Sequence, residues 1–340
     1  MTHLQPSRSL LRPRVIALLI LALSATTSLQ VASADCPGRD RVKIVDNNVV
    51  ADNGTPLRGA PFMIDFDWGV PHMQANESQY RAYFRTISRD YHFNHVRLCA
   101  FVGNYDFDFD DKVYKDRLVY LCDTITDWAQ QDGIYVSINQ HSQTLTNFKV
   151  DRWKKFWDII APRYKDRTHV LYEATNEPKV EVAQKFMPAM YQYLRKYRGA
   201  TQTHIILWSG VKPRDIPLEI IRKHSDGIDY TNASYGFHSY WNCDQIFEEA
   251  AQIRKYYPSI CTEVHSLTNA NDYPVDWDTL RCHLGQAEAA GFSWTQWGPT
   301  AHYRGYNPSA QYDTDGPNRF PKDYFDRIGQ RWQADYESCD

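Results

Sequence analysis

The stretch HVLYEATNEP at residues 169–178 joins a buried strand to a polar end, and this combination decides the fold. The run Val-Leu-Tyr at 170–172 predicts a strand because β-branched and aromatic residues favour that conformation. Asn176 and Glu177 follow, and Pro178 stops the strand because proline has no backbone N–H to donate. A polar Asn-Glu pair at the end of a buried strand is expected at the mouth of a barrel, where functional groups collect.

The same unit, a short apolar run followed by a longer stretch with helical spacing, recurs along the chain. The predicted strands are residues 61–67, 95–101, 134–141, 169–176, 204–210, 233–240, 259–265 and 292–298. The predicted helices include 80–91, 115–131, 182–197, 244–257, 277–290 and 322–336, and Gly133 and Gly291 supply left-handed helix ends. Eight strand–helix units predict the α/β class and a single (β/α)8 TIM barrel. A doubly wound open sheet is the rival, but no Gly-rich phosphate loop follows any of these strands.

The first residues are typical of an export signal. Arg8, Arg12 and Arg14 precede the apolar run 15–23, and Ala-Ser-Ala at 32–34 fits a cleavage site. We therefore expect residues 1–34 to be a signal peptide, residues 35–340 to be one catalytic domain, and the mature protein to be secreted. Without the three arginines of residues 1–34, the chain has 35 basic and 41 acidic residues, which gives a net charge near −6. This balance argues against nucleic acid or an anionic membrane as a partner.

Cysteine usage fits the same oxidising environment. The chain has seven cysteines and no C-x-x-C pair, so disulfides are expected rather than a metal clip. A bridge between Cys36 and Cys339 would join the two ends of the mature chain. The pairing itself stays open at this point, and the odd count leaves at least one thiol unpaired.

Polar and aromatic side chains fall at or near the ends of six predicted strands. In a (β/α)8 barrel these ends meet at one face, which carries the active site. The candidate site residues are Arg97, Asn139, His141, Asn176, Glu177, His238, Tyr240, Glu263, His265 and Trp297. Glu173 lies further from the strand end and is expected to be structural.

Glu177 and Glu263, on the fourth and seventh predicted strands, are the two carboxylates of this set. Hydrolysis of a glycosidic bond requires one carboxylic acid to protonate the leaving oxygen. It also requires one carboxylate to attack the sugar or to activate water. A separation of about 5–5.5 Å indicates retention of configuration and about 6.5–9.5 Å inversion. Arg97 and Tyr240 are suited to keeping one carboxylate ionised by charge and hydrogen bonding.

These residues resemble a known family. The Asn-Glu-Pro of VLYEATNEP is similar to the signature of glycoside hydrolase family 5, the cellulase-type enzymes of clan A. The resemblance extends from DNGTPLRGA at 52–60 through HVRL, NQH, FHSY and CTEVH to SWTQWG. It implies a retaining mechanism with Glu177 as the acid/base and Glu263 as the nucleophile.

The resemblance also implies supporting roles around the two glutamates. Asn176 is expected to meet a sugar 2-hydroxyl, and Trp297 to be the stacking floor below that sugar. Arg97 and Tyr240 are expected to orient Glu263, with His238 near Glu177 and His141 bordering the substrate. The family often has Asp where this chain has Asn139, which leaves the partner of His141 open.

The expected function is a secreted retaining glycosidase that cleaves β-glucan or cellulose in an endoglucanase-like manner. The alternatives are an endo-β-1,4-mannanase or an exo-β-1,3-glucanase on the same fold, and a non-catalytic carbohydrate-binding barrel. A polysaccharide or oligosaccharide is the expected partner of a monomer that uses no metal and no cofactor. Trp68, Tyr105, Trp241, Tyr303 and Tyr306 are candidate sugar-stacking residues on loops.

Overall fold

The computed structural model describes residues 39–64, 66, 69–100, 109–141, 149–210, 212–240, 242–264 and 277–297, all within the compact unit Asp35–Asp340. Several sequence predictions fall outside these residues. They are the export signal at 1–34, the helix at 322–336, Cys36, Cys339, His265, and the loop aromatics Trp68, Tyr105, Trp241, Tyr303 and Tyr306.

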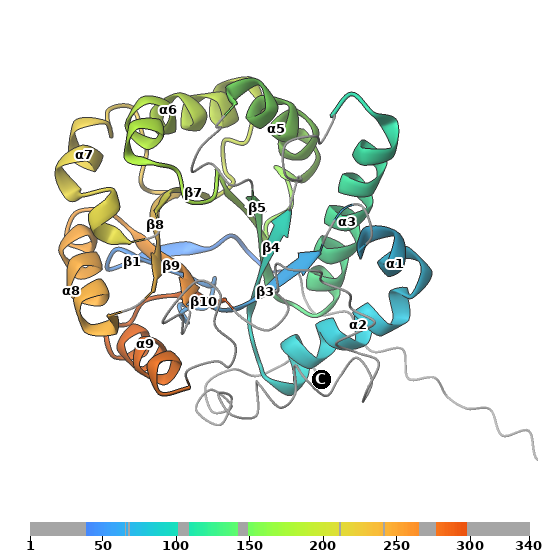
Figure 1. Ribbon diagram of the computed structural model, residues 1–340, viewed down its shortest axis with the longest axis horizontal. Coiled ribbons are helices and arrows are strands. Elements are labelled where there is room, and N and C mark those ends of the chain that lie inside the picture. Colours follow the sequence, from blue (N-terminus) through green and yellow to red (C-terminus); the bar gives the residue numbers. More distant parts are fainter. Residues whose placement is uncertain are drawn as a thin grey trace, which may run out of the picture. The chain divides into compact units, whose positions relative to one another are not determined.

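Eight parallel strands form a closed barrel, as the sequence predicts (Figure 1). Each strand pairs with the next along the chain, and the last, β10, pairs with both β9 and β3 to close the ring. The strands are β3 (Arg58–Ile64), β4 (His95–Ala100), β5 (Tyr135–Gln140), β6 (Val170–Glu173), β7 (Ile205–Gly210), β8 (Ala233–Ser239), β9 (Ser259–Val264) and β10 (Trp294–Gln296). The open-sheet alternative is therefore wrong.

Helices surround the strands (Figure 1). They are α1 (Gly69–Ala75), α2 (Glu77–Arg85), α3 (Lys112–Gln131), α5 (Val150–Tyr164), α6 (Val180–Gln192), α7 (Leu218–Lys223), α8 (Cys243–Arg254) and α9 (Trp277–Ala289). One π-turn, Thr86–Asp90, extends α2, and a second, Tyr193–Tyr197, extends α6. Gly133 and Gly291 have φ angles of 66° and 68°, which confirms the predicted left-handed helix ends.

Helix α5 was not among the predicted helices, although its sequence explains it. Trp153, Phe156, Trp157, Ile160 and Tyr164 are buried at spacings of three and four residues, so they form one apolar helix face. Trp153 and Trp157 both donate from Nε1 to the carbonyl of Ala174, at 2.7 and 3.1 Å. The helix is thereby fixed directly behind the polar end of β6.

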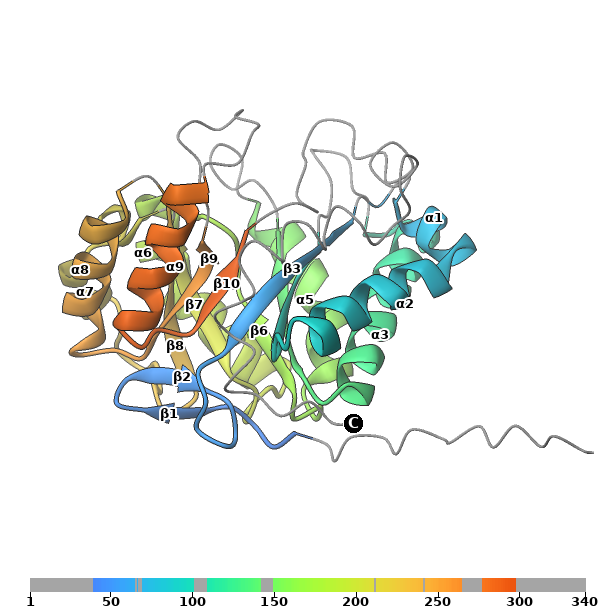
Figure 2. The same cartoon turned by 90° about the horizontal axis from the view of Figure 1, so that it is seen from below.

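A hairpin closes the end of the barrel at which the strands begin (Figure 2). Strands β1 (Lys43–Val45) and β2 (Asn48–Val50) are joined by Asp46 and Asn47, whose positive φ angles of 49° and 56° suit a tight two-residue turn. The segment buries an apolar cluster against the barrel floor, formed by Val49, Ala51, Leu57, Tyr135, Leu171, Ile206 and Ile260.

A hydrogen-bonded layer inside the barrel is centred on His95, which lies two residues before Arg97 on β4. His95 contacts Ser137 Oγ at 3.0 Å and Thr295 Oγ1 at 3.1 Å, and thereby links β4 to β5 and β10. A Cβ atom at Gly59 would lie 2.6 Å from His95 Nδ1 and 2.7 Å from Thr295 Oγ1, so only glycine fits there. Burial lowers the pKa of His95 to about 3, so its ring is neutral.

Among the described residues, no helix has the length and apolar character needed to cross a membrane. Cys243 and Cys282 form a disulfide, while Cys99, Cys122 and Cys261 are buried thiols. Disulfides were predicted from the cysteine count, and this pairing was not.

Candidate active site

Arg97 is the centre of a buried ion network. It lies on β4 with no exposed surface, and its Nε and Nη2 donate to the two carboxylate oxygens of Glu173 at 2.6 and 2.8 Å. Its Nη1 donates to Glu263 Oε1, and Nη2 also donates to Asn176 Oδ1 at 2.8 Å. The planar guanidinium thus links β4 to β6 and β9, and holds two carboxylates in fixed positions.

Glu173 was expected to be structural only, and the structure places it in the site as the partner of Arg97. It is fully buried, and its bidentate pair with Arg97 fixes the direction in which the guanidinium points toward Glu263. Strand alternation could have revealed it, because Leu171 packs in the barrel-floor cluster and Glu173 is two residues later. An arginine inside an apolar strand also requires a buried counter-charge.

Three side chains contact the Glu263 carboxylate on β9. Arg97 donates to Oε1, the Tyr240 hydroxyl donates to Oε2, and His238 Nδ1 lies 3.2 Å from Oε2. A register shift between Phe237 and His238 on β8 places His238 opposite Glu263. Burial raises the pKa of Glu263, while the positive charges of His238 and Arg97 and the Tyr240 hydrogen bond oppose that rise.

Glu177 lies beside this group and is more accessible. Its side chain is 21% exposed, compared with 2% for Glu263, so solvent reaches one carboxylate and not the other. His238 Nδ1 lies 2.9 Å from Glu177 Oε1, and oxygen atoms of the two glutamates lie within 4.8 Å of each other. One histidine nitrogen therefore contacts both carboxylates.

The backbone at Glu177 has an unusual conformation. Its φ angle is 42°, a left-handed value that costs about 1–3 kcal/mol in a non-glycine residue, and such residues cluster at functional sites. The Glu177 N–H donates to the carbonyl of Ser209 at 2.9 Å. Trp208, the preceding residue on β7, is also left-handed, with φ 65°, within an irregular part of the β7–β8 pairing. The hydrogen bond to Ser209 therefore ties the Glu177 backbone to this irregular part of β7.

A stacked pair forms another part of the site. The rings of His141 and Trp297 are 5.3 Å apart and nearly parallel at 10°, and the Arg97 guanidinium carbon is 5.8 Å from the Trp297 ring centre. His141 Nδ1 lies 2.7 Å from Asn139 Oδ1, so Asn139 is the partner that the sequence left open. Burial and the charges of Arg97 and His238 hold the pKa of His141 well below its ordinary value, which makes the ring neutral.

The structure brings together all the sequence-predicted site residues that it describes. The group is Arg97, Asn139, His141, Asn176, Glu177, His238, Tyr240, Glu263 and Trp297, with Glu173 added. Their catalytic roles remain predictions at this point.

Glu177, His238 and Glu263 are also close enough together to ligate a metal ion. However, His238 Nδ1 lies 2.9 Å from Glu177 Oε1 and 3.2 Å from Glu263 Oε2, which are hydrogen-bonding distances. Arg97 already supplies a fixed positive charge to Glu263.

An eight-stranded barrel that presents two close carboxylates at one end of its strands suits glycosidic chemistry, and comparison with known proteins agrees. Residues 51–298 match the family model described as Cellulase (glycosyl hydrolase family 5), so the chain belongs to that family.

Two curated relatives have similar sequences. Endoglucanase E-5 of Thermobifida fusca is 23% identical over 229 residues, which cover 64% of this chain and 48% of the relative. Endoglucanase MaCel5A of Microbulbifer sp. (strain ALW1) is 22% identical over 231 residues, with coverage of 64% and 44%. The chain thus spans about half the length of the curated relatives it matches.

Solved structures share the fold. Cellulase Cel5C_n superposes with a TM-score of 0.67 at 19% identity, over 89% of this chain and 95% of that one. A catalytic-domain variant of Thermobifida fusca endoglucanase Cel5A (E5), in complex with cellotetraose, gives 0.60 at 20% identity, with coverage of 76% and 85%.

Proposed function

We propose that this chain is an exported, monomeric endoglucanase that hydrolyses β-glucan or cellulose with net retention of configuration. Glu177 is the acid/base and Glu263 the nucleophile. The observation that carries the proposal is the separation of the two carboxylates, whose oxygens lie within 4.8 Å of each other. This spacing fits retention, because inversion needs room for a water molecule between the sugar and the base.

The reaction has two steps. Glu263 attacks the anomeric carbon, the glycosidic C–O bond breaks, and Glu177 gives its proton to the leaving oxygen. Water then attacks the glycosyl-enzyme ester while Glu177 takes a proton from it, and the sugar is released from Glu263.

The surroundings of each glutamate support this division of roles. Glu263 accepts from Arg97 and Tyr240, and such donors favour the ionised form that a nucleophile requires. Glu177 is the more exposed carboxylate, so a leaving group and a water molecule can both reach it.

Substrate class and export are supported by further features. A half-buried indole such as Trp297 offers an apolar face on which sugar C–H groups can stack. The names of the curated relatives, both endoglucanases, favour a β-glucan. The Cys243–Cys282 disulfide suits an oxidising compartment, as does the leader-like composition of residues 1–34.

The purified protein should be tested on carboxymethylcellulose, barley β-glucan, mannan and laminarin, with new reducing ends measured. We expect hydrolysis of the first two, with internal cuts that lower viscosity early. Proton NMR of the first product should show the β-anomer before mutarotation. Preference for mannan or laminarin would support one of the alternative enzymes. Binding without any release of reducing ends would favour a non-catalytic carbohydrate-binding barrel, and an α-anomer would overturn the retaining mechanism.

A Tyr240→Phe variant should change the pH dependence of the activity. Glu263 must be ionised to attack, so kcat/KM falls as pH drops through its raised pKa. The Tyr240 hydrogen bond lowers that pKa, so its loss should move the acid limb to higher pH by about 1–2 units. Tyr172→Phe is the matched control because the Tyr172 hydroxyl donates to Ala161 O, outside the site. An unmoved acid limb in Tyr240→Phe would contradict the role of Glu263.

A further inference from the structure

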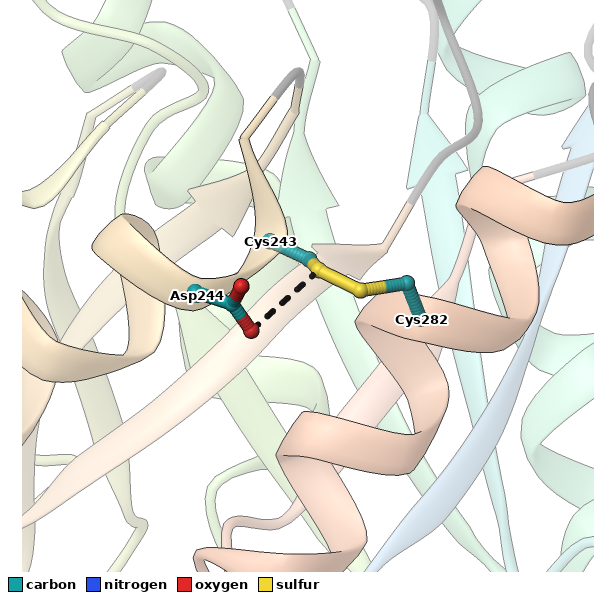
Figure 3. Close-up of side chains that lie close together, drawn as sticks. All are labelled: Cys243, Asp244 and Cys282. Carbon is teal, nitrogen blue, oxygen red and sulfur yellow. Dashed lines mark hydrogen bonds between the residues drawn. A yellow bond between two sulfur atoms is a disulfide. The ribbon is translucent and has the colours of Figure 1, made fainter.

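Helix α9 contacts the end of β8 and the start of α8 at three positions. The Cys243–Cys282 disulfide has a Cα–Cα distance of 6.1 Å, within the usual range (Figure 3). The other two contacts are Ser239 Oγ to His283 Nδ1 at 2.5 Å and Gln286 Nε2 to Asp244 Oδ1 at 2.7 Å. We call these three contacts the α9 clamp.

The residues that the α9 clamp holds flank Tyr240 in the sequence. Ser239 directly precedes Tyr240, and Cys243 follows it by three residues. Their partners on α9, His283 and Cys282, are adjacent. Both ends of the short segment that carries Tyr240 are therefore fixed to one helix.

Helix α9 is itself a rigid support. Leu280, Leu284 and Ala287 are buried in the core. Near the C-terminal end of the helix, Glu288 forms a bidentate pair with Arg58 on β3, at 2.9 and 2.8 Å, and accepts from Trp294 Nε1 on β10 at 2.6 Å. The helix thus connects the Tyr240 segment to the strands that close the barrel.

We propose that the α9 clamp holds the Tyr240 hydroxyl against Glu263, which makes Cys243, Cys282 and His283 positioning residues for hydrolysis. The inference rests on the proposed role of Glu263 as nucleophile. Hydrogen bonds weaken steeply with misalignment, and those to a charged acceptor are the stronger ones. A shift of the β8–α8 segment would therefore weaken the Tyr240–Glu263 bond without removing any group that touches substrate.

The test is a Cys243→Ser/Cys282→Ser variant. Two quantities are measured: the acid limb of kcat/KM, and the titration of the Glu263 carboxyl carbon by 13C NMR. The NMR signal is assigned by its absence from Glu263→Gln. Both should move to higher pH by about 0.5–1 unit, part of the shift expected for Tyr240→Phe. Because Glu263 loses a partner needed for attack, kcat should fall more than KM changes.

Asp132→Asn is the matched control, since it breaks the ion pair with Arg81, which involves no residue of α9 or β8. It should lower Tm and leave the titration of Glu263 unchanged. In a Tyr240→Phe background, removal of the disulfide should give no further shift, because the two changes act on the same bond. The proposal would be overturned if the Cys243→Ser/Cys282→Ser variant had a lower Tm but an unchanged titration of Glu263. It would also be overturned if the shifts caused by this variant and by Tyr240→Phe were fully additive. The NMR titration does not depend on hydrolysis, so it distinguishes failure of the clamp from failure of the proposed enzyme.

Discussion

A Glu263→Gln variant is expected to lose polysaccharide hydrolysis by more than the about 10²–10⁴-fold that general acid–base catalysis contributes. The amide cannot attack the anomeric carbon, so no glycosyl-enzyme forms. The fold should persist, because the glutamine oxygen can still accept from Arg97 and its amide nitrogen can donate to the Tyr240 hydroxyl oxygen. The measurement is initial rate on barley β-glucan, with circular dichroism to verify folding.

Glu177→Gln is the matched variant, and it separates the two roles. It should lose about 10²–10⁴-fold on polysaccharide. On an aryl glycoside whose phenol leaves without protonation, its first step should stay fast and give a burst of phenol. Glu263→Gln should show no burst on the same substrate. If Glu177→Gln kept full activity on polysaccharide, or if the burst pattern were reversed, the assignment of roles would be wrong.

An Arg97→Met variant is expected to show the largest loss of stability. Removal of the cation leaves the buried carboxylates of Glu173 and Glu263 without their shared partner. Breaking a buried pair in this way costs about 3–5 kcal/mol of the free energy of unfolding. The loss should be measured by urea denaturation at pH 7. It should be smaller near pH 4, because carboxylates whose folded-state pKa has risen become protonated and then cost less to bury.

The double variant Arg97→Met/Glu173→Gln tests the cause of that loss. It removes one of the two unpaired charges, so part of the stability should return. Activity should not return, because Glu263 still lacks its cation. Equal stability of Arg97→Met and the wild type would show that the network does not hold the barrel together.

The strands were predictable because each buried run is bounded by clear turn or helix signals. The first and last residues of the strands differ from the predicted ones where tertiary contacts decide them. β3 begins at Arg58, three residues before the predicted start, because Arg58 and Gly59 pair with β10 as the barrel closes. Helix α5 was not predicted although its apolar residues recur at spacings of three and four, and Pro162 interrupts this pattern near the end of the helix.

The sequence predicted which residues form the site, but it did not predict how they contact one another. The ends of parallel strands must meet, so the rim residues could be grouped from sequence. The bidentate Arg97–Glu173 pair, the left-handed Glu177 and the contact of His238 with both glutamates depend on register shifts and side-chain rotation. Neither register shifts nor side-chain rotations can be read from a short sequence pattern. The family resemblance supplied expected roles for individual residues, and Glu173 was not among them.

The β1–β2 hairpin has a consequence for how a long polymer is handled. Its apolar cluster seals the floor of the barrel, and Arg97 with its two carboxylates fills the interior above. Under the proposed function, a glucan strand would be unable to thread along the barrel axis. It would have to be engaged sideways across one face, and both fragments would have to leave from that same face. If the protein were attached to a solid support by a linker before Arg39, on the side of the hairpin, the face that carries the active site would point away from the support.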